Sequence, residues 1–284
     1  MTTPQEALDA AGQLPDVEID IAGTALQFAR IDAPDADWQS AARHLSDLAR
    51  DAVALARDLP STDLAARAGA LAGLIAGRHR YAGDTDSYDD PANANLIRVI
   101  ERRRGLPVAL GVLWLHCTRA IGWGASGLDF PGHFLLALEE SPSRTRAKPG
   151  PQQTVLDVFA GGVPLDSRDL RNLLKRVAGP EAELRPGVLA PMSARRVLLR
   201  LQDNIRTRRL AASDPEGALA CTLDMLRLAP DNATLWREAA LLHQKLDQVT
   251  AALRCYARVL ELVPDGEGAL STRSAIDDLR GRLN

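Results

Sequence analysis

The chain has 284 residues, enough for one full core and a second, smaller unit, so two domains are expected. A formal charge of −3 and a pI near 6.0 give no overall basic field that would attract nucleic acid or anionic lipid. The segment Met1 to Asp20 has neither a basic start nor an apolar run, and no stretch of about twenty uncharged apolar residues follows it. We therefore expect a cytoplasmic protein that binds neither nucleic acid nor membrane.

The first elements are read from the spacing of apolar residues. Val17, Ile19 and Ile21 alternate with acidic residues, which predicts a short strand. The segments Trp38 to Arg57 and Asp63 to Arg78 carry apolar residues at helical spacing, so two amphipathic helices are expected there.

A further helix is predicted from Tyr88 to Gly105. Asp90 is its expected N-cap, Pro91 lies in its first turn, and Gly105 is its expected terminator. The run of three arginines at positions 102 to 104 has two interpretations. It could contact an anion, or it could place positive charge at the negative end of the helix dipole, and we favour the second.

The middle of the chain predicts one helix and two strands that together carry a histidine and an aspartate. Pro107 to Ile121 is apolar nearly all round, as in a fully buried helix. Phe130 to Leu138 and Thr154 to Phe159 read as adjacent antiparallel strands. Strand periodicity places His133 and Asp157 on faces where they can meet. Such a pair either belongs to a catalytic site or is a buried hydrogen bond that fixes strand register.

These segments resemble known enzymes. The runs GLPVALGVLWLHCTRAIGWGAS, FPGHFLLALE and TVLDVF look like the transglutaminase-like branch of the papain-type thiol enzymes. The run DDPANANLIRVIERRRGLPVALGVLWL followed by FPGHFLL is similar to the SirB-type bacterial family, in which a transglutaminase-like domain precedes tetratricopeptide repeats. The resemblance implies an α+β, mostly helical fold, in which a papain/transglutaminase-like core of one helix and a small antiparallel sheet is followed by a short helical array.

The resemblance also places the three members of a Cys-His-Asp triad. His133 and Asp157 match two of them, whereas the position of the nucleophile falls on Pro107, or on Ala109 if the alignment slips by two residues. Neither side chain can attack a substrate. Cys117 lies ten residues beyond Pro107, about 15 Å along a helix, and its apolar neighbours predict an inert core thiol.

Neither a metal nor a cofactor is expected. The chain has three cysteines at wide spacing, Cys117, Cys221 and Cys255, which fit neither a disulfide framework nor a zinc site. His133, Asp157 and His116 form a conceivable ligand set, but no spacing in the sequence supports it.

The last third of the chain contains an internal repeat. Pro230 and Pro264 are 34 residues apart, as are Cys221 and Cys255, and this period is typical of tetratricopeptide repeats. The first repeat starts at about Leu199 and the second at Ala233, and a last helix is expected from Gly268 to Leu283. The second repeat has the residues that the pattern requires, namely Trp236, Ala239, Ala240, Ala252, Tyr256 and Pro264. We therefore predict a transglutaminase-like domain over 1–190 and helical repeats over 191–284.

Repeats of this kind usually bind peptide segments in a groove, and the alternative is that they only brace the first domain. The candidate binding residues are Asn204, Arg208, Trp236, Arg237 and Gln244. The favoured function is therefore a non-catalytic protein that holds a protein or peptide partner through its retained cleft and its repeats. The alternative is a hydrolase or acyltransferase that uses His133 and Asp157 with Cys117 or an activated water. The sequence does not specify an oligomeric state.

Overall fold

The protein is mostly α-helical with one small antiparallel sheet, as predicted. The computed structural model describes residues 2–57, 59, 63–140, 153–185 and 187–281. Two compact units are present: one spans Pro15–Leu201, and the other joins Met1–Leu14 to Gln202–Asn284. The composition of the first residues did not indicate that they join the C-terminal helices. The domain boundary at residue 190 remains a prediction.

The sheet of the unit Pro15–Leu201 has five strands in the order β6-β5-β4-β3-β7. The strands are β3 (Ala125–Phe130), β4 (His133–Glu139), β5 (Gln153–Asp157), β6 (Val163–Leu165) and β7 (Pro191–Met192). The antiparallel pairing of β4 with β5 confirms the predicted neighbours. The strand predicted from Phe130 to Leu138 starts later, at His133. Phe130 belongs to β3, and Pro131 and Gly132 form the tight turn between β3 and β4.

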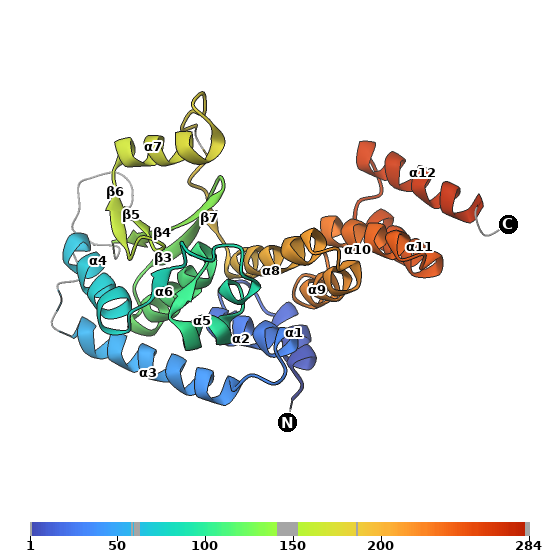
Figure 1. Cartoon of the computed structure of the whole chain (residues 1–284). Helices are drawn as coiled ribbons and strands as arrows, with labels where there is room; N and C mark the ends of the chain where they lie inside the picture. Colours follow the sequence, from blue (N-terminus) through green and yellow to red (C-terminus); the bar gives the residue numbers. More distant parts are fainter. Residues whose placement is uncertain (1, 58, 60–62, 141–152, 186, 282–284) are drawn as a thin grey trace. The chain divides into compact units, whose positions relative to one another are not determined.

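Helices cover both faces of this sheet (Figure 1). On one face, α7 (Ser167–Ala178) inserts Leu170 and Leu174 into a cluster with Leu128, Leu135 and Val155. On the other face lies α6 (Pro107–Ile121), whose predicted bounds are confirmed. Phe134 of β4 packs so closely on Gly111 of α6 that a Cβ atom there would lie 2.1 Å from its ring. The first turns of α6 are therefore in contact with the start of β4.

The helices behind α6 differ in part from the prediction. They are α2 (Ile21–Asp32), α3 (Trp38–Ala56) and α4 (Leu64–Ala72), and the last continues as a π-helical turn over Gly73–Arg78. The strand predicted around Val17 to Ile21 was wrong, because Asp20 accepts a hydrogen bond from the N–H of Gly23 and starts α2. Ile19 and Ile21 are buried, as they would be in a strand, but they flank the N-cap residue of a helix.

The single helix predicted from Tyr88 to Gly105 was also wrong. The segment forms a 3-10 turn (Pro91–Asn93), then α5 (Leu96–Arg102), and then the short strand β2 (Arg104–Gly105), which pairs in parallel with β1 (Ala82–Gly83). Asn95 caps α5 by accepting from the N–H groups of Ile97 and Arg98. The helix ends because Arg103 adopts a left-handed conformation with φ of 56°.

The second unit is built from paired helices. It contains the last part of α8 (Ala194–Ala211), then α9 (Pro215–Leu228), α10 (Ala233–Lys245), α11 (Val249–Leu262) and α12 (Glu267–Gly281). Helix α10 starts at Ala233, as the repeat predicted, and Ala218, Ala239, Ala240 and Ala252 are fully buried where helices approach closely.

An N-terminal helix that the sequence analysis did not anticipate, α1 (Pro4–Gly12), completes this unit by packing on α9. Leu8 is fully buried, and Asp9 forms an ion pair with Arg227. In the described part of the chain, none of the helices combines the length and the apolar composition needed to cross a bilayer.

Candidate functional site

The two residues predicted to form a site, His133 and Asp157, are in contact. Nε2 of His133 lies 3.0 Å from Oδ1 of Asp157, and the side chains are 12% and 14% exposed. The same oxygen of Asp157 accepts from the N–H groups of Phe159 and Ala160, at 3.0 and 3.2 Å. The turn after β5 therefore fixes the carboxylate, and the carboxylate fixes the imidazole and leaves Nδ1 as its second nitrogen.

The environment of Asp157 favours its charged form. Burial by itself raises the pKa of this carboxyl, but the hydrogen bond with His133 and the two backbone N–H groups outweigh burial, so the pKa is lowered. Asp157 is therefore ionised at neutral pH. A carboxylate of this kind can hold an imidazole in one orientation, whether or not the imidazole takes part in a reaction.

Aromatic rings connect this pair to the strands that lead into α6. The ring of Phe159 lies 6.1 Å from that of His133 and 6.0 Å from that of Tyr88, both edge to face. Phe159 also covers Gly83, where a Cβ atom would lie 2.5 Å from its ring. Gly83 pairs with Gly105, two residues before Pro107. The Phe159 ring and strand β1 thus lie between the histidine and the backbone that leads into α6.

Arg200 of α8 holds the strand that carries His133. One Nη atom donates to the carbonyl of His133 at 2.6 Å and to that of Phe130 at 3.3 Å, while the other pairs with Asp129. The hairpin between β3 and β4 is therefore fixed at its turn by a guanidinium that makes charge-assisted hydrogen bonds.

The start of α6 offers no group that could act as a nucleophile. Its N-cap residue is Leu106, which makes no side-chain cap bond, and Pro107, Val108 and Ala109 are all buried. Cys117 is fully buried, and desolvation raises its pKa to about 12. At neutral pH it is a thiol, whereas a nucleophilic cysteine must be a thiolate.

The three consecutive arginines all act within the fold. Arg102 pairs with Asp84 at 3.0 Å and with Asp90 at 2.8 Å, and Arg104 donates to the carbonyl of Gly83 at 3.3 Å. Arg103 donates to Tyr81 and to His44 and stacks on the Tyr81 ring. The favoured interpretation had paired these charges with the helix dipole, but their actual partners come from distant segments.

The contact between Arg103 and His44 was missed in the sequence, because 59 residues separate them and neither belongs to a motif. His44 also faces His79 at a ring distance of 5.5 Å, and His79 bonds to Asp51 at 2.9 Å. Desolvation, with the nearby charges of Arg103 and His79, lowers the pKa of His44 to about 4. His44 therefore accepts from Arg103 as a neutral ring.

The candidate binding residues of the repeats all lie in the second unit. Trp236 is half-buried and donates from Nε1 to the carbonyl of Pro230 at 2.7 Å. Arg237 donates to Ser271 of α12 at 2.6 Å, and Arg208 donates to the carbonyl and to Oδ1 of Asn204, at 3.1 and 3.2 Å. Gln244 accepts from the hydroxyl of Tyr256 at 2.6 Å. Each of these side chains thus has an internal contact.

The described residues contain no group of three His, Cys, Asp or Glu side chains placed to hold a metal ion. His116 instead bonds through Nε2 to the carbonyl of Leu45 at 2.9 Å. Two prominent pockets are found, one near Leu115 and Met192 and one between α11 and α12, and neither includes His133 or Asp157. The first had no sequence signal, because its lining comes from three separate segments of the chain.

In comparisons with known proteins, two different families match consecutive parts of the chain. The transglutaminase-like superfamily matches residues 39–203, and a tetratricopeptide repeat family matches residues 205–277. A UPF0162 protein of Xylella fastidiosa is 31% identical over 202 residues, which cover 70% of this chain and 69% of that protein. A UPF0162 protein of Pseudomonas aeruginosa is 30% identical over 267 residues, which cover 93% of this chain and 92% of that protein. The chain therefore belongs to the UPF0162 family, the SirB-type family that joins a transglutaminase-like domain to tetratricopeptide repeats.

Proposed function

We propose that the protein is a non-catalytic member of the transglutaminase-like superfamily that binds a protein or peptide partner. The start of α6 supports the proposal, because the resemblance puts the nucleophile at Pro107 or Ala109 and neither side chain can attack a substrate. An acyl transfer by a thiol enzyme requires an attacking thiolate at this place, next to an oriented imidazole. The orienting pair of His133 and Asp157 is present, but the attacking atom is not.

The helical repeats are the second support for a binding role. Tetratricopeptide arrays present the first helices of successive repeats to a common groove, and such grooves hold extended or helical peptides. Arg237 of α10 reaches Ser271 of α12, which lies 34 residues, or one repeat period, later in the chain. This contact places a charged side chain between two helices that would line such a groove.

A second function is favoured by one observation. His133 is held through Nε2, so Nδ1 is the nitrogen that could accept a proton from a water molecule. A hydrolase that uses an activated water would need this nitrogen but no cysteine. This alternative predicts turnover of an ester or amide that depends on His133.

The test compares variants of the full chain that separate these functions. Partners are captured by chemical crosslinking in the native host and identified by mass spectrometry, with wild type, Arg237→Glu and Arg254→Glu as baits. Arg254 is exposed on α11 and serves as the control for charge reversal. We expect a partner that wild type and Arg254→Glu crosslink equally and that Arg237→Glu loses.

A panel of ester and amide substrates is assayed in parallel with wild type and His133→Ala. The proposal predicts no turnover above that of buffer. Turnover that disappears in His133→Ala would contradict the non-catalytic assignment and favour the water-activating hydrolase. A partner set that Arg237→Glu leaves unchanged would argue against binding through the repeats.

A further inference from the structure

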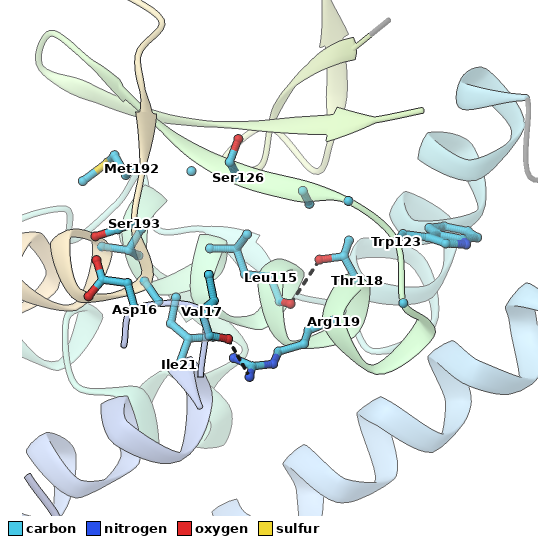
Figure 2. A pocket seen from close by; sticks show the side chains of 16 residues that line it. Asp16, Val17, Ile21, Leu115, Thr118, Arg119, Trp123, Ser126, Met192 and Ser193 are labelled. Atoms are coloured by element: carbon cyan, nitrogen blue, oxygen red, sulfur yellow. Dashed lines mark hydrogen bonds between the residues drawn. The ribbon is translucent and has the colours of Figure 1, made fainter. Parts of the chain in front are cut away.

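A cavity of about 530 Å³ lies in the unit Pro15–Leu201, away from the pair of His133 and Asp157. Three segments of the chain line it and leave it open to solvent: residues 16–21 up to the start of α2, residues 115–127 from the second half of α6 into β3, and residues 192–197 at the junction of β7 with α8. Figure 2 shows its side chains. A volume of about 300–1,000 Å³ is usual for sites that hold small organic molecules.

The wall of this cavity is mainly apolar. Its apolar lining residues are Val17, Ile21, Leu115, Met192 and Val197. Val17 is 83% exposed, which is unusual for a large apolar residue. Strand β7 ends at Met192, which pairs with Gly127, so the first residues of β3 extend past it and border the cavity. Ile21, Met192 and Val197 are already buried by the protein, so a ligand with an apolar body would mainly cover Val17 and Leu115.

The polar groups of the wall are mostly satisfied by the protein itself. Asp16 pairs with Arg195 at 2.9 Å, and Ser193 accepts from the N–H of Arg196 at 3.3 Å. The hydroxyl of Thr118 donates to the carbonyl of Leu115 at 3.0 Å, as Figure 2 shows. These groups therefore offer little to a polar ligand, and the apolar side chains dominate the interior.

Arg119 is the exception. Its guanidinium donates to the carbonyls of Ile19 and Val17, the latter at 3.1 Å, and Figure 2 shows it beside the cavity. Among the described residues, no carboxylate lies within ion-pair distance of Arg119, whereas Arg195 pairs with Asp16 of the wall. A guanidinium has five N–H donors, and the two carbonyls use only some of them. The cavity thus has one positive charge that is balanced only by backbone dipoles and solvent.

We propose that this cavity binds a small monocarboxylic acid with an apolar body, whose carboxylate pairs with Arg119 and whose chain lies against Val17 and Leu115. Charge complementarity supports an acid over an amine or an alcohol, because Asp16 is already neutralised by Arg195. The apolar interior supports a ligand longer than acetate. This site is separate from the proposed partner binding and does not depend on it.

The test uses the full chain and four probes: octanoate, 1-octanol, octylamine and acetate. Binding is measured by titration calorimetry. We expect saturable binding of octanoate, with 1-octanol and octylamine weaker by about tenfold because they lack the charge-assisted hydrogen bond. Acetate should not bind measurably, since it has no apolar body.

Two variants locate the ligand within the cavity. Arg119→Gln should weaken octanoate about tenfold and leave 1-octanol unchanged, while Leu115→Trp should fill the cavity and abolish binding of both. Arg104→Gln is the control, because Arg104 is also exposed and also donates to a carbonyl, but lies outside the cavity. Equal binding of octanoate to wild type and Arg119→Gln would overturn the pairing with Arg119. Absence of saturable binding by octanoate would overturn the site.

Discussion

His133 and Asp157 lie diagonally across two neighbouring strands, with Nε2 and Oδ1 3.0 Å apart. The register of β4 and β5 pairs Ala137 with Val155, so continuing it places Leu135, not His133, directly opposite Asp157. The contact therefore depends on the turn after β5, whose N–H groups at Phe159 and Ala160 hold the carboxylate. A diagonal contact of this kind fixes strand register even when no reaction takes place.

The first prediction concerns the contribution of this contact to stability. Asp157→Asn should lower the free energy of unfolding by about 1–3 kcal/mol at neutral pH, because it removes the charged acceptor of a partly buried hydrogen bond. Asp47→Asn, which removes an exposed carboxylate paired with Arg50, should cost less than about 1 kcal/mol. Urea unfolding measures both. Equal losses would mean that the pair of His133 and Asp157 contributes nothing specific.

The lowered pKa of Asp157 also predicts a pH dependence. A carboxyl whose pKa is lower in the folded protein stabilises the fold above its ordinary pKa. This stabilisation is lost as the pH falls through the lowered pKa of the folded state, because Asp157 is then protonated in the folded protein as well as in the unfolded one. Wild type should therefore lose more stability than Asp157→Asn on acidification below the ordinary pKa. Parallel curves for the two proteins would contradict the assignment.

The second prediction tests whether His133 faces the start of α6. Pro107→Cys and, separately, Ala109→Cys introduce a thiol at the two candidate positions of the nucleophile. The positive end of the helix dipole and a nearby imidazole should lower the pKa of such a thiol below the ordinary value of about 8.5. The pH dependence of alkylation measures this pKa. Adding His133→Ala should raise it again at whichever position faces the histidine, and no change at either would place His133 elsewhere.

The third prediction concerns His44. Its pKa is lowered from 6.5 to about 4, mainly by desolvation and then by the charges of Arg103 and His79, which outweigh Asp47 and Asp51. Its neutral ring therefore stabilises the fold fully above pH 6.5, and this contribution is lost as the pH falls toward 4. An NMR titration of the ring should give a midpoint near 4. A midpoint at 6.5 or above would contradict the described contact with Arg103.

The fourth prediction concerns α1. A Cβ atom at Gly12 would lie 2.2 Å from the carbonyl oxygen of Arg227, so Gly12→Ala must displace α1 from α9. We expect a loss of about 1–3 kcal/mol in stability and faster proteolysis near α1. Gly268→Ala is the control, because a Cβ atom there meets nothing within 4 Å. It should be neutral or stabilise α12 by up to about 1 kcal/mol. Equal protease sensitivity of the two variants would argue against the docking of α1.

Sequence signals were sufficient for α6 and for the start of α10, whereas α8 begins at Ala194, before the predicted start of the first repeat at about Leu199. A 34-residue period fixed the start of α10 at Ala233, and a nearly uniform apolar composition fixed α6 from Pro107 to Ile121. Where a strand signal and a helix signal overlapped in the same segment, the prediction was wrong. The alternation of Val17 to Ile21 indicated a strand, yet the cap at Asp20 produced a helix. The predicted terminator Gly105 was wrong, because Arg103 ends the helix and Gly105 lies in strand β2.

The contact of His133 with Asp157 was predictable because both residues lie on adjacent strands with clear periodicity. The partners of the three arginines were not, since Arg102 pairs with Asp84 and Arg103 with His44, across 18 and 59 residues. The cavity beside Arg119 was not predictable either, because segments from residue 16 to residue 197 line it. Such long-range contacts depend on how the helices pack, which no local pattern contains.

The most direct test of the non-catalytic assignment is the rate at which Cys117 reacts with iodoacetamide at neutral pH. Peptide mass spectrometry follows this residue separately from Cys221 and Cys255, in native and in urea-denatured protein. Because burial raises the pKa of Cys117 to about 12, the native thiol should react far more slowly than the denatured one. A native Cys117 that reacts faster than the denatured thiol, and slows in His133→Ala, would show an activated nucleophile and contradict the proposal.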